Sequence, residues 1–126
     1  MELVRATALM LAKQGAKVVL GAPGSERLVE LVTRINKNAG EAVFAVADGR
    51  HRDDLVHLVK LAVDQYGRLD VIISNAGVNE LSCMDELDVE GREEMVDVNL
   101  KGTLYGIAAA IRVFLEQGSV IEPGIF

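Results

Sequence analysis

Apolar and polar residues follow two different periods along this chain, one typical of helices and the other of strands. Apolar residues recur at helical spacing in several stretches, and short continuous apolar runs lie between them. The pattern predicts helices over 3–14, from Ser25 to Gly40, and from Asp53 to Tyr66, with strands over 17–21, 42–47 and 70–74. Beyond these it predicts a loop over 79–88, mainly helix over 89–117, and a short strand over 118–122.

This alternation of helices and strands favours a parallel sheet with helices on both faces. Residues at the boundaries support it, because Gly15 and Gly40 end helices and Ser25 can cap the start of one. A break near Asn99 is expected in the last helix, since an asparagine side chain competes for local backbone hydrogen bonds. The chain shows no linker or repeat, and we expect one domain over residues 1–126.

Composition narrows the classes of partner and compartment. The net charge of -6 and the pI of about 4.9 argue against nucleic acid and anionic membrane as partners. The single cysteine, Cys83, cannot form an internal disulfide, which is typical of a reducing compartment. The first residues lack a basic region, and no apolar run approaches the length that crosses a bilayer. A cytoplasmic protein is therefore expected. A metal site is not expected, because the sequence offers no clear third ligand beside His51 and His57.

Two motifs carry the clearest functional signal. The stretch 67–77 ends a predicted strand with Ser74-Asn-Ala-Gly, and small residues at such a carboxyl end let a ligand approach the backbone. The second motif, Asp-Val-Asn-Leu-Lys-Gly, covers 97–102. Together they resemble the Asn-Asn-Ala-Gly and active-site asparagine motifs of the short-chain dehydrogenase/reductase family, with Ser74 in place of the first asparagine. The resemblance extends from about Ala6 to Gln117.

The resemblance implies an α/β fold, a Rossmann-like doubly wound parallel sheet with strand order 3-2-1-4-5-6. It also implies an oxidoreductase that moves hydride between NAD or NADP and a small-molecule alcohol or carbonyl. The strands of this chain would be the family's second, third and fourth, so the fold is incomplete and its central first strand is missing. Strands 17–21 and 70–74 then either pair directly or leave their inner edges open.

The resemblance also assigns cofactor positions. Ala22 stands where the family places an acid for the ribose hydroxyl or an arginine for a 2′-phosphate. The lack of an acid there weakly favours NADP over NAD. The alternative is that this segment is a plain turn without a role in cofactor binding. Asp48 would reach the adenine ring or cap a helix. The pocket floor would be formed by three residues of the first motif: Asn75, Ala76 and Gly77.

Two parts of the family's machinery have no counterpart in the sequence. Glu2 and Val4 align with the last two glycines of the phosphate loop, where close approach to a pyrophosphate is needed. The favoured alternative is that residues 1–4 are an unrelated start of a truncated chain, which leaves the phosphate site equally absent. Of the catalytic group only Asn99 is matched, and the serine, tyrosine and lysine are absent. Neither Tyr66 nor Tyr105 has a lysine four residues later. The chain is therefore expected to be an inactive, partial dinucleotide-binding domain.

The end of the chain allows two interpretations. Residues 118–121 resemble the family's fifth strand, in which case the chain stops short. Residues 120–124 resemble a later Pro-Gly motif, in which case the catalytic segment has been skipped. The second is slightly favoured, because Glu-Pro-Gly is unusual at a strand end.

Three functional alternatives remain open at this point. The chain is an oxidoreductase by family, a catalytically dead fragment acting by association, or a gene-model fragment with no function. A homo-oligomer is expected through the helix over 103–115, whose matching helix in the family packs against a second subunit. Its apolar stripe consists of Leu104, Ile107, Ala108, Ile111 and Leu115.

Overall fold

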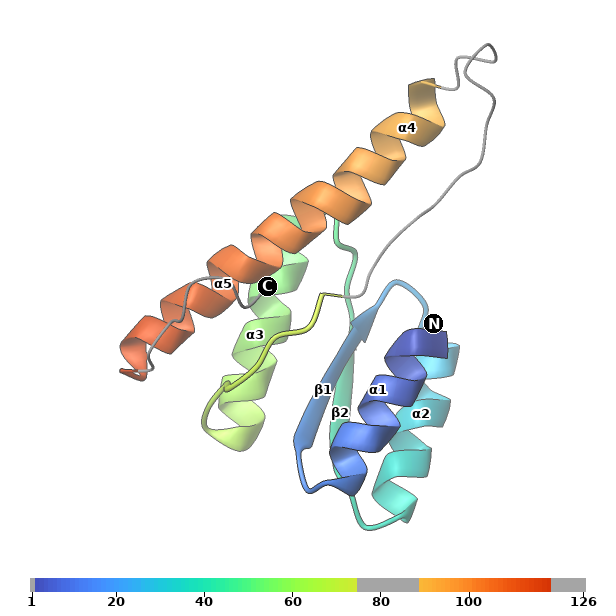
Figure 1. Cartoon of the computed structure of the whole chain (residues 1–126), viewed down its shortest axis with the longest axis vertical. Helices are drawn as coiled ribbons and strands as arrows, with labels where there is room; N and C mark the ends of the chain where they lie inside the picture. The colour runs from blue at the N-terminus through green and yellow to red at the C-terminus, as the bar shows by residue number, and fades with distance from the viewer. Residues whose placement is uncertain (1, 75–88, 119–126) are drawn as a thin grey trace.

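The computed structural model describes residues 2–74 and 89–118 (Figure 1). Its elements in order are α1 (Glu2–Lys13), β1 (Lys17–Ala22), α2 (Glu26–Lys37), β2 (Glu41–Val46), α3 (Arg52–Tyr66), α4 (Val89–Met95), the π-helix η2 (Val96–Lys101) and α5 (Gly102–Glu116). The first three predicted helices and the first two predicted strands are confirmed, with ends that differ by at most three residues. The predicted loop over 79–88 lies outside the described residues, as does nearly all of the predicted strand over 118–122.

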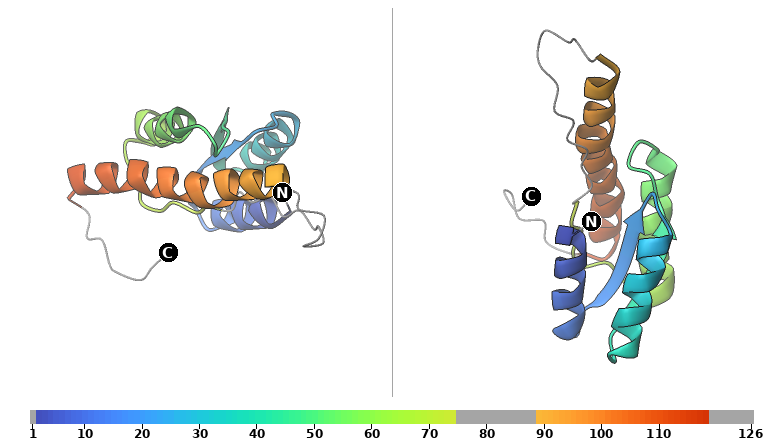
Figure 2. Two further views of the ribbon diagram at one scale, coloured as in Figure 1. Left: turned by 90° about the horizontal axis from the view of Figure 1, so that it is seen from above. Right: turned by 90° about the vertical axis from the view of Figure 1, so that its right-hand side faces the viewer.

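The two strands form a parallel sheet, with Lys17 opposite Glu41 at one end and Ala22 opposite Val46 at the other. Helices α1 and α2 lie on one face of this sheet, while α3 lies on the other with α5 packed against it (Figures 1 and 2). The predicted parallel sheet with helices on both faces is therefore confirmed. A parallel pair requires a crossover connection, which α2 provides.

The main core lies between the sheet and the pair α1 and α2. Side chains of a strand alternate between faces, so Val18 and Leu20 of β1 enter this core together. Leu28 of α2 is completely buried within it. On the opposite face β1 carries Gly21, and a Cβ placed there would lie 2.5 Å from Leu58 Cδ2 of α3. Absence of a side chain at this position lets α3 pack closely on the sheet.

The predicted strand over 70–74 is wrong for this structure. Within the described residues the sheet has two strands, and the segment from Asp70 to Ser74 joins neither of them. Val71 and Ile73 are 68% and 51% exposed. A strand is stabilised by the ladder it joins, and the neighbour expected between β1 and this segment has no counterpart among residues 2–74 and 89–118. Of the two alternatives left open above, direct pairing is excluded for the described residues.

Residues 89–118 confirm the predicted helix, but a continuous π-helical turn stands in place of the predicted break near Asn99. Helix α4 continues without a gap through η2 into α5, and Asn99 lies inside the π-helical turn. Small residues on one side of α5, Gly106 and Ala110, are buried and allow its close contact with α3. The irregular turn therefore falls at the position where the second motif places its asparagine.

The segment Glu93–Glu116 is long and apolar enough, by length and composition alone, to cross a membrane. Its mean hydropathy is 1.2, and 17% of the apolar window is buried. This finding differs from the expectation that no apolar run approaches that length. Because η2 and α5 form one helix, apolar stretches that polar residues separate in the sequence are joined into a single span. Core helices of proteins in water meet the same criterion but are mostly buried, whereas this window is mostly exposed and its buried side packs on α3.

Candidate functional site

The candidate site lies at the carboxyl edge of the two parallel strands. The amide of Ala47 donates a hydrogen bond to the carbonyl of Ala22 at 3.0 Å, which extends the ladder one residue past β2. This bond brings the end of β1 and the residue before Asp48 to the same edge. The structure therefore places Ala22 and Asp48, both predicted as cofactor positions, on the edge where ligands of such sheets bind.

The Asp48 carboxylate is engaged by Arg50, two residues later in the chain. It accepts a hydrogen bond from the Arg50 backbone N–H at 2.9 Å, and Arg50 Nε lies 3.1 Å from each of its oxygens. Arg50 Nη2 donates to Oδ2 at 2.7 Å. The Asp48 backbone N–H donates to Asp54 Oδ2 at 2.9 Å, which ties this loop to the first turn of α3. The carboxylate itself thus binds Arg50 rather than capping α3, whose N-cap position is His51.

These contacts set the charge of Asp48. The pKa of its carboxyl group is lowered from 3.8 to about 2, first by the hydrogen bond from the Arg50 side chain and then by the bond from the Arg50 backbone. The same pairing raises the pKa of Arg50. His51 Nε2 lies 3.8 Å from Asp48 Oδ2 and adds a weaker attraction. Asp48 is therefore an anion over the whole physiological pH range.

The two sequence motifs meet through Thr103. The hydroxyl oxygens of Ser74 and Thr103 lie 3.1 Å apart, at hydrogen-bond distance. Thr103 Oγ1 also donates to the carbonyl of Asn99 at 2.8 Å, across the start of α5. The end of the 68–74 segment is thereby joined to the π-helical turn that carries Asn99. Such turns occur frequently at functional sites, because they redirect side chains within a helix.

A close approach of two glycines joins the remaining parts of the site. A Cβ on Gly102 would lie 3.1 Å from the carbonyl oxygen of Gly49, and a Cβ on Gly49 would lie 3.5 Å from Gly102 Cα. The loop after β2 and the start of α5 are therefore in backbone contact. This contact explains why residue 102, at the start of α5, is a glycine. It also brings the Asp48 loop beside the turn that contains Asn99.

The structure thus brings four of the named positions to one edge: Ala22, Asp48, Ser74 and Asn99. Asn75, Ala76 and Gly77 lie outside the described residues, so their assignment stays a prediction. The sequence analysis does not identify Arg50 and Thr103 as site residues, although Arg50 lies two residues after Asp48 and Thr103 four residues after Asn99. Within residues 2–74 and 89–118, no three histidine, cysteine, aspartate or glutamate side chains are grouped as metal ligands.

A nicotinamide dinucleotide fits these residues only on its adenosine side. Ala22 and Asp48 occupy suitable positions, but the Asp48 carboxylate already accepts from three groups of Arg50. At the pyrophosphate side, α1 begins at Glu2 and continues through Val4 in regular helix, without a glycine loop among the described residues. A pyrophosphate requires close approach of several backbone N–H groups. The residues present do not supply that approach.

Tyr66 does not stand in for a catalytic tyrosine. It lies at the end of α3, and the ammonium of Lys17 sits 5.7 Å from the centroid of its ring. Lys17 begins β1, so this pair occupies the amino edge of the sheet, opposite the candidate site. Burial raises the pKa of Tyr66, whereas proton transfer at neutral pH needs a lowered one.

Comparison with known proteins agrees with this geometry. The family model described as short chain dehydrogenase matches residues 3–122. An uncharacterized oxidoreductase of Listeria monocytogenes is 45% identical over 115 residues, which cover 91% of this chain and 46% of the relative. An uncharacterized oxidoreductase of Bacillus subtilis is 32% identical over 112 residues, covering 89% of this chain and 32% of the relative. The chain spans less than half the length of these relatives.

Solved structures show the same relationship. A 3-ketoacyl-ACP reductase from Sinorhizobium meliloti superposes with a TM-score of 0.85 at 29% identity, covering 90% of this chain and 45% of that one. A variant of actinorhodin polyketide ketoreductase with NADPH also gives a TM-score of 0.85, at 28% identity and with 90% and 44% coverage. The sheet is part of an incomplete Rossmann-like fold, Ser74 and Asn99 of the two motifs are joined through Thr103, and the chain belongs to the short-chain dehydrogenase family.

Proposed function

We propose that this chain carries part of the site of a nicotinamide-dependent oxidoreductase that acts on alcohol or carbonyl groups of small molecules. The observation that carries the proposal is the connection of Ser74 to Asn99 through Thr103, which joins both family motifs. The neighbour solved with NADPH supports NADP, and the lack of an acid at Ala22 tilts in the same direction. In this assignment Asn99 is the catalytic-site position. The cofactor positions are Ala22, Asp48, Asn75, Ala76 and Gly77.

By itself, the chain is proposed to transfer no hydride. Proton transfer to a substrate oxygen needs a positioned acid whose pKa lies near neutrality. The sequence contains no tyrosine followed four residues later by lysine, and Tyr66 lies at the wrong edge of the sheet. Asn99 cannot replace that group, because a carboxamide does not titrate in this range.

Absorbance of NADPH and NADH with a panel of carbonyl substrates tests this proposal. We expect no turnover by the purified chain. The full-length Listeria relative, purified in the same way, is assayed beside it as the control. Turnover that disappears in an Asn99→Ala variant of this chain would contradict the proposed inactivity and would assign a catalytic site to it.

Dinucleotide binding is proposed to be far weaker than in a complete member of the family. Each charge-assisted hydrogen bond to a phosphate contributes about 1.5–3 kcal/mol, so loss of two or three corresponds to several orders of magnitude in affinity. The net charge of -6 adds no attraction for a dinucleotide anion. Calorimetric titration with NADPH and NADH should give dissociation constants well above the micromolar range. Micromolar affinity for either one would overturn this part of the proposal.

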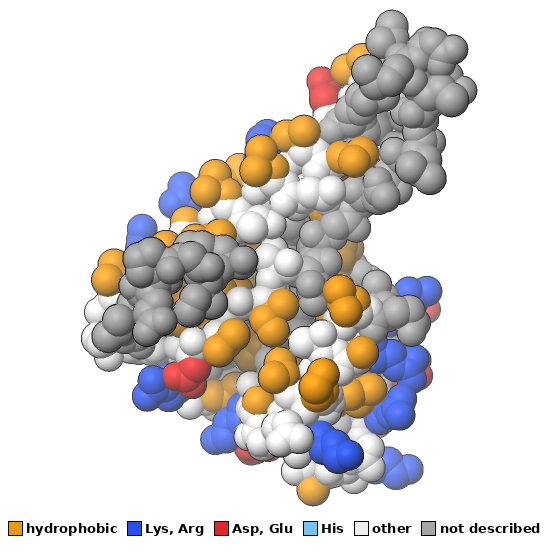
Figure 3. Space-filling model, viewed as in Figure 1, with side chains coloured by type: hydrophobic (Ala, Val, Ile, Leu, Met, Phe, Trp, Pro, Cys, Tyr) orange, Lys and Arg blue, Asp and Glu red, His pale blue; other side chains and the backbone are white. Residues whose placement is uncertain are grey.

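Association is the second candidate function, and exposed leucines on α5 favour it. Leu104 and Leu115 are 59% and 64% exposed, and apolar side chains gather along this helix in Figure 3. Burial of such a side chain contributes about 1.5–3 kcal/mol. A second copy of the chain would bury these leucines against its own, and it is the partner that we propose. A cytoplasmic location, in keeping with the single cysteine, belongs to the same proposal.

Light scattering tests the association. We expect the wild-type chain to form a dimer or larger oligomer, and Leu104→Glu to shift it toward monomer. Val29→Glu changes a half-exposed valine on α2 and serves as the matched control. A monodisperse monomer across the concentration range would exclude this candidate function and leave only the family assignment.

A further inference from the structure

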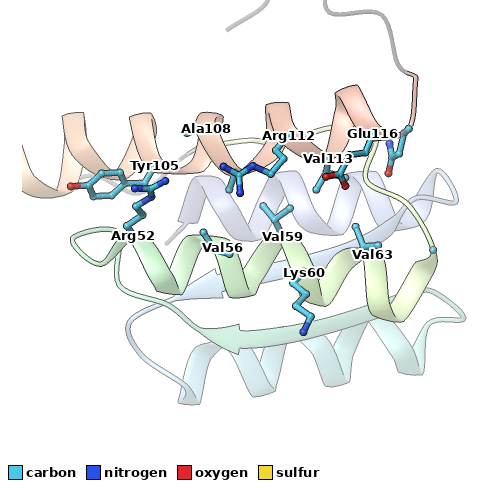
Figure 4. A pocket seen from close by; sticks show the side chains of 13 residues that line it. Arg52, Val56, Val59, Lys60, Val63, Tyr105, Ala108, Arg112, Val113 and Glu116 are labelled. Atoms are coloured by element: carbon cyan, nitrogen blue, oxygen red, sulfur yellow. The ribbon is translucent and has the colours of Figure 1, made fainter.

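A groove separate from the candidate site runs between α3 and α5. Its volume is about 410 Å³, which falls in the range of about 300–1,000 Å³ typical of small-molecule sites. Its floor is apolar, with Val56, Val59 and Val63 from α3 facing Ala109 and Val113 from α5. Figure 4 shows the three valines pointing from α3 toward α5. The exposed leucines of the association candidate do not line it.

Two arginines border this apolar floor. Arg52 rises from the first turn of α3 to the level of Tyr105, and Arg112 reaches into the groove from α5 (Figure 4). Neither has an ion-pair or hydrogen-bond partner among residues 2–74 and 89–118, where Asp48, Asp70, Asp97 and Glu41 pair with other cations. In a chain with net charge -6, two unpaired guanidinium groups beside one apolar groove form a local cationic site.

The position of Arg52 at the start of α3 also favours a cationic site that takes an anion. The first turn of a helix carries the positive end of the helix dipole, which disfavours a cation there. Glu116, the acidic residue of the lining, stands at the far end of the groove from Arg52 in Figure 4. Lys60 also lines the groove, but its side chain points away from α5. Among the lining residues, the two arginines therefore lie at the end near Tyr105 and at the middle of the groove.

We propose that this groove binds an amphiphilic anion, with an alkyl tail along the valines and alanines and an anionic head between Arg52 and Arg112. The apolar floor removes the tail from water, and guanidinium groups offer planar, bidentate donors to a carboxylate or phosphate. A groove of this volume admits one small molecule, whereas a partner helix would need a wider surface. The same chemistry occurs in a free fatty acid and in the acyl chain of an anionic lipid.

Calorimetric titration of the 126-residue chain with dodecanoate, below its micelle-forming concentration, tests the proposal. We expect saturable binding at one site, weakened about tenfold by Arg112→Gln and by Arg52→Gln, with a further decrease at high salt. Ala108→Trp places a large ring over the groove from an exposed position and should abolish binding. Arg27→Gln removes an exposed arginine of α2 that lies outside the groove and has no side-chain partner within the described part of the chain, and it should leave affinity unchanged.

Other results would overturn the proposal. Equal affinity of dodecanoate for wild type and both arginine variants would show that the guanidinium groups do not hold the head. Equal affinity for a neutral dodecyl amphiphile would exclude an anionic site. Binding to phosphatidylglycerol vesicles without binding of monomeric dodecanoate would assign the surface to membranes, and a dimer abolished by Ala108→Trp but unaffected by dodecanoate would assign it to a second copy.

Discussion

The side-chain amide of Gln117 binds the backbone of Leu69 in both directions. The Leu69 N–H donates to Gln117 Oε1 at 2.8 Å, and Gln117 Nε2 donates to the Leu69 carbonyl at 2.7 Å. The amide thus provides the hydrogen bonds that a neighbouring strand would provide. Asn36 makes the same pair of bonds to Ala42 in β2, at 2.9 and 3.2 Å. Two carboxamides therefore satisfy backbone groups of Leu69 and Ala42 that no strand of the described residues bonds.

Replacing Gln117 should destabilise the chain. Gln117→Ala leaves both partly buried backbone groups of Leu69 without their partner, and we expect a cost of about 1–2 kcal/mol in the free energy of unfolding. Urea unfolding followed by circular dichroism measures it. Gln65→Ala changes an exposed glutamine of α3 and should have almost no effect. Equal stability of the two variants would show that water replaces the Gln117 amide without loss.

The Asp48–Arg50 pair should lose its contribution to stability only in strongly acidic solution. The folded-state pKa of Asp48, about 2, lies below its ordinary value of 3.8, so its contribution is complete above pH 4 and disappears as pH falls toward 2. The Arg50 side chain is 48% exposed, and solvent screening keeps the contribution of the pair small. Arg50→Gln should remove this pH dependence, whereas Arg68→Gln, in an exposed pair with Asp70, should not. NMR titration of the Asp48 carboxyl group gives the direct check, and a value near 3.8 in the wild type would contradict the pairing.

The hydroxyl of Thr103 should hold the end of the 68–74 segment. Thr103→Val preserves the shape of the side chain but removes its bonds to Ser74 and to the Asn99 carbonyl. Because these groups are exposed, we expect a loss below about 1 kcal/mol together with faster amide hydrogen exchange in 70–74. Thr33→Val, on an exposed face of α2, is the matched control. Unchanged exchange in the Thr103 variant would mean that Gln117 alone anchors the segment.

Two buried glycines of α5 should respond in opposite directions. A Cβ at Gly106 would meet the terminal carbon of Ile72 at 3.4 Å, which is ordinary contact. Gly106→Ala should therefore stabilise the chain by about 0.5–1 kcal/mol, because glycine is a poor residue for helix interiors. Thermal and urea unfolding measure the change, and destabilisation would show that α5 cannot shift from Ile72.

Gly102→Val should destabilise the chain. A Cβ at Gly102 lies 3.1 Å from the backbone oxygen of Gly49, and the additional methyl groups of valine crowd that loop further. Overpacking of this kind costs about 1–3 kcal/mol. Gly24→Val, where a Cβ would have no neighbour within 4 Å, is the matched control for the substitution. Equal effects at both positions would exclude close packing as the reason for glycine at 102.

Much of the candidate site was predictable, since Asp48 and Ala22 end strands that the apolar pattern identifies. Their common edge follows from parallel pairing alone. Capture of the Asp48 carboxylate by Arg50 was not predicted, because a carboxylate can accept from a ligand, a helix end or a nearby guanidinium. Only the folded loop selects among these. The groove between α3 and α5 was equally hidden, since its valines and arginines come from two helices far apart in sequence.

The sequence by itself determined the helices, the first two strands, the position of the irregular turn at Asn99 and the family. These features depend on local spacing, on glycines at helix ends and on short motifs. The tertiary structure alone decided the fate of residues 70–74, which have strand-like composition but no ladder. Strand formation requires hydrogen bonds from a segment elsewhere in the chain, and in this structure the Gln117 amide supplies the two that Leu69 receives. Local sequence encodes which residues favour a strand, but pairing depends on a neighbour that local sequence does not contain.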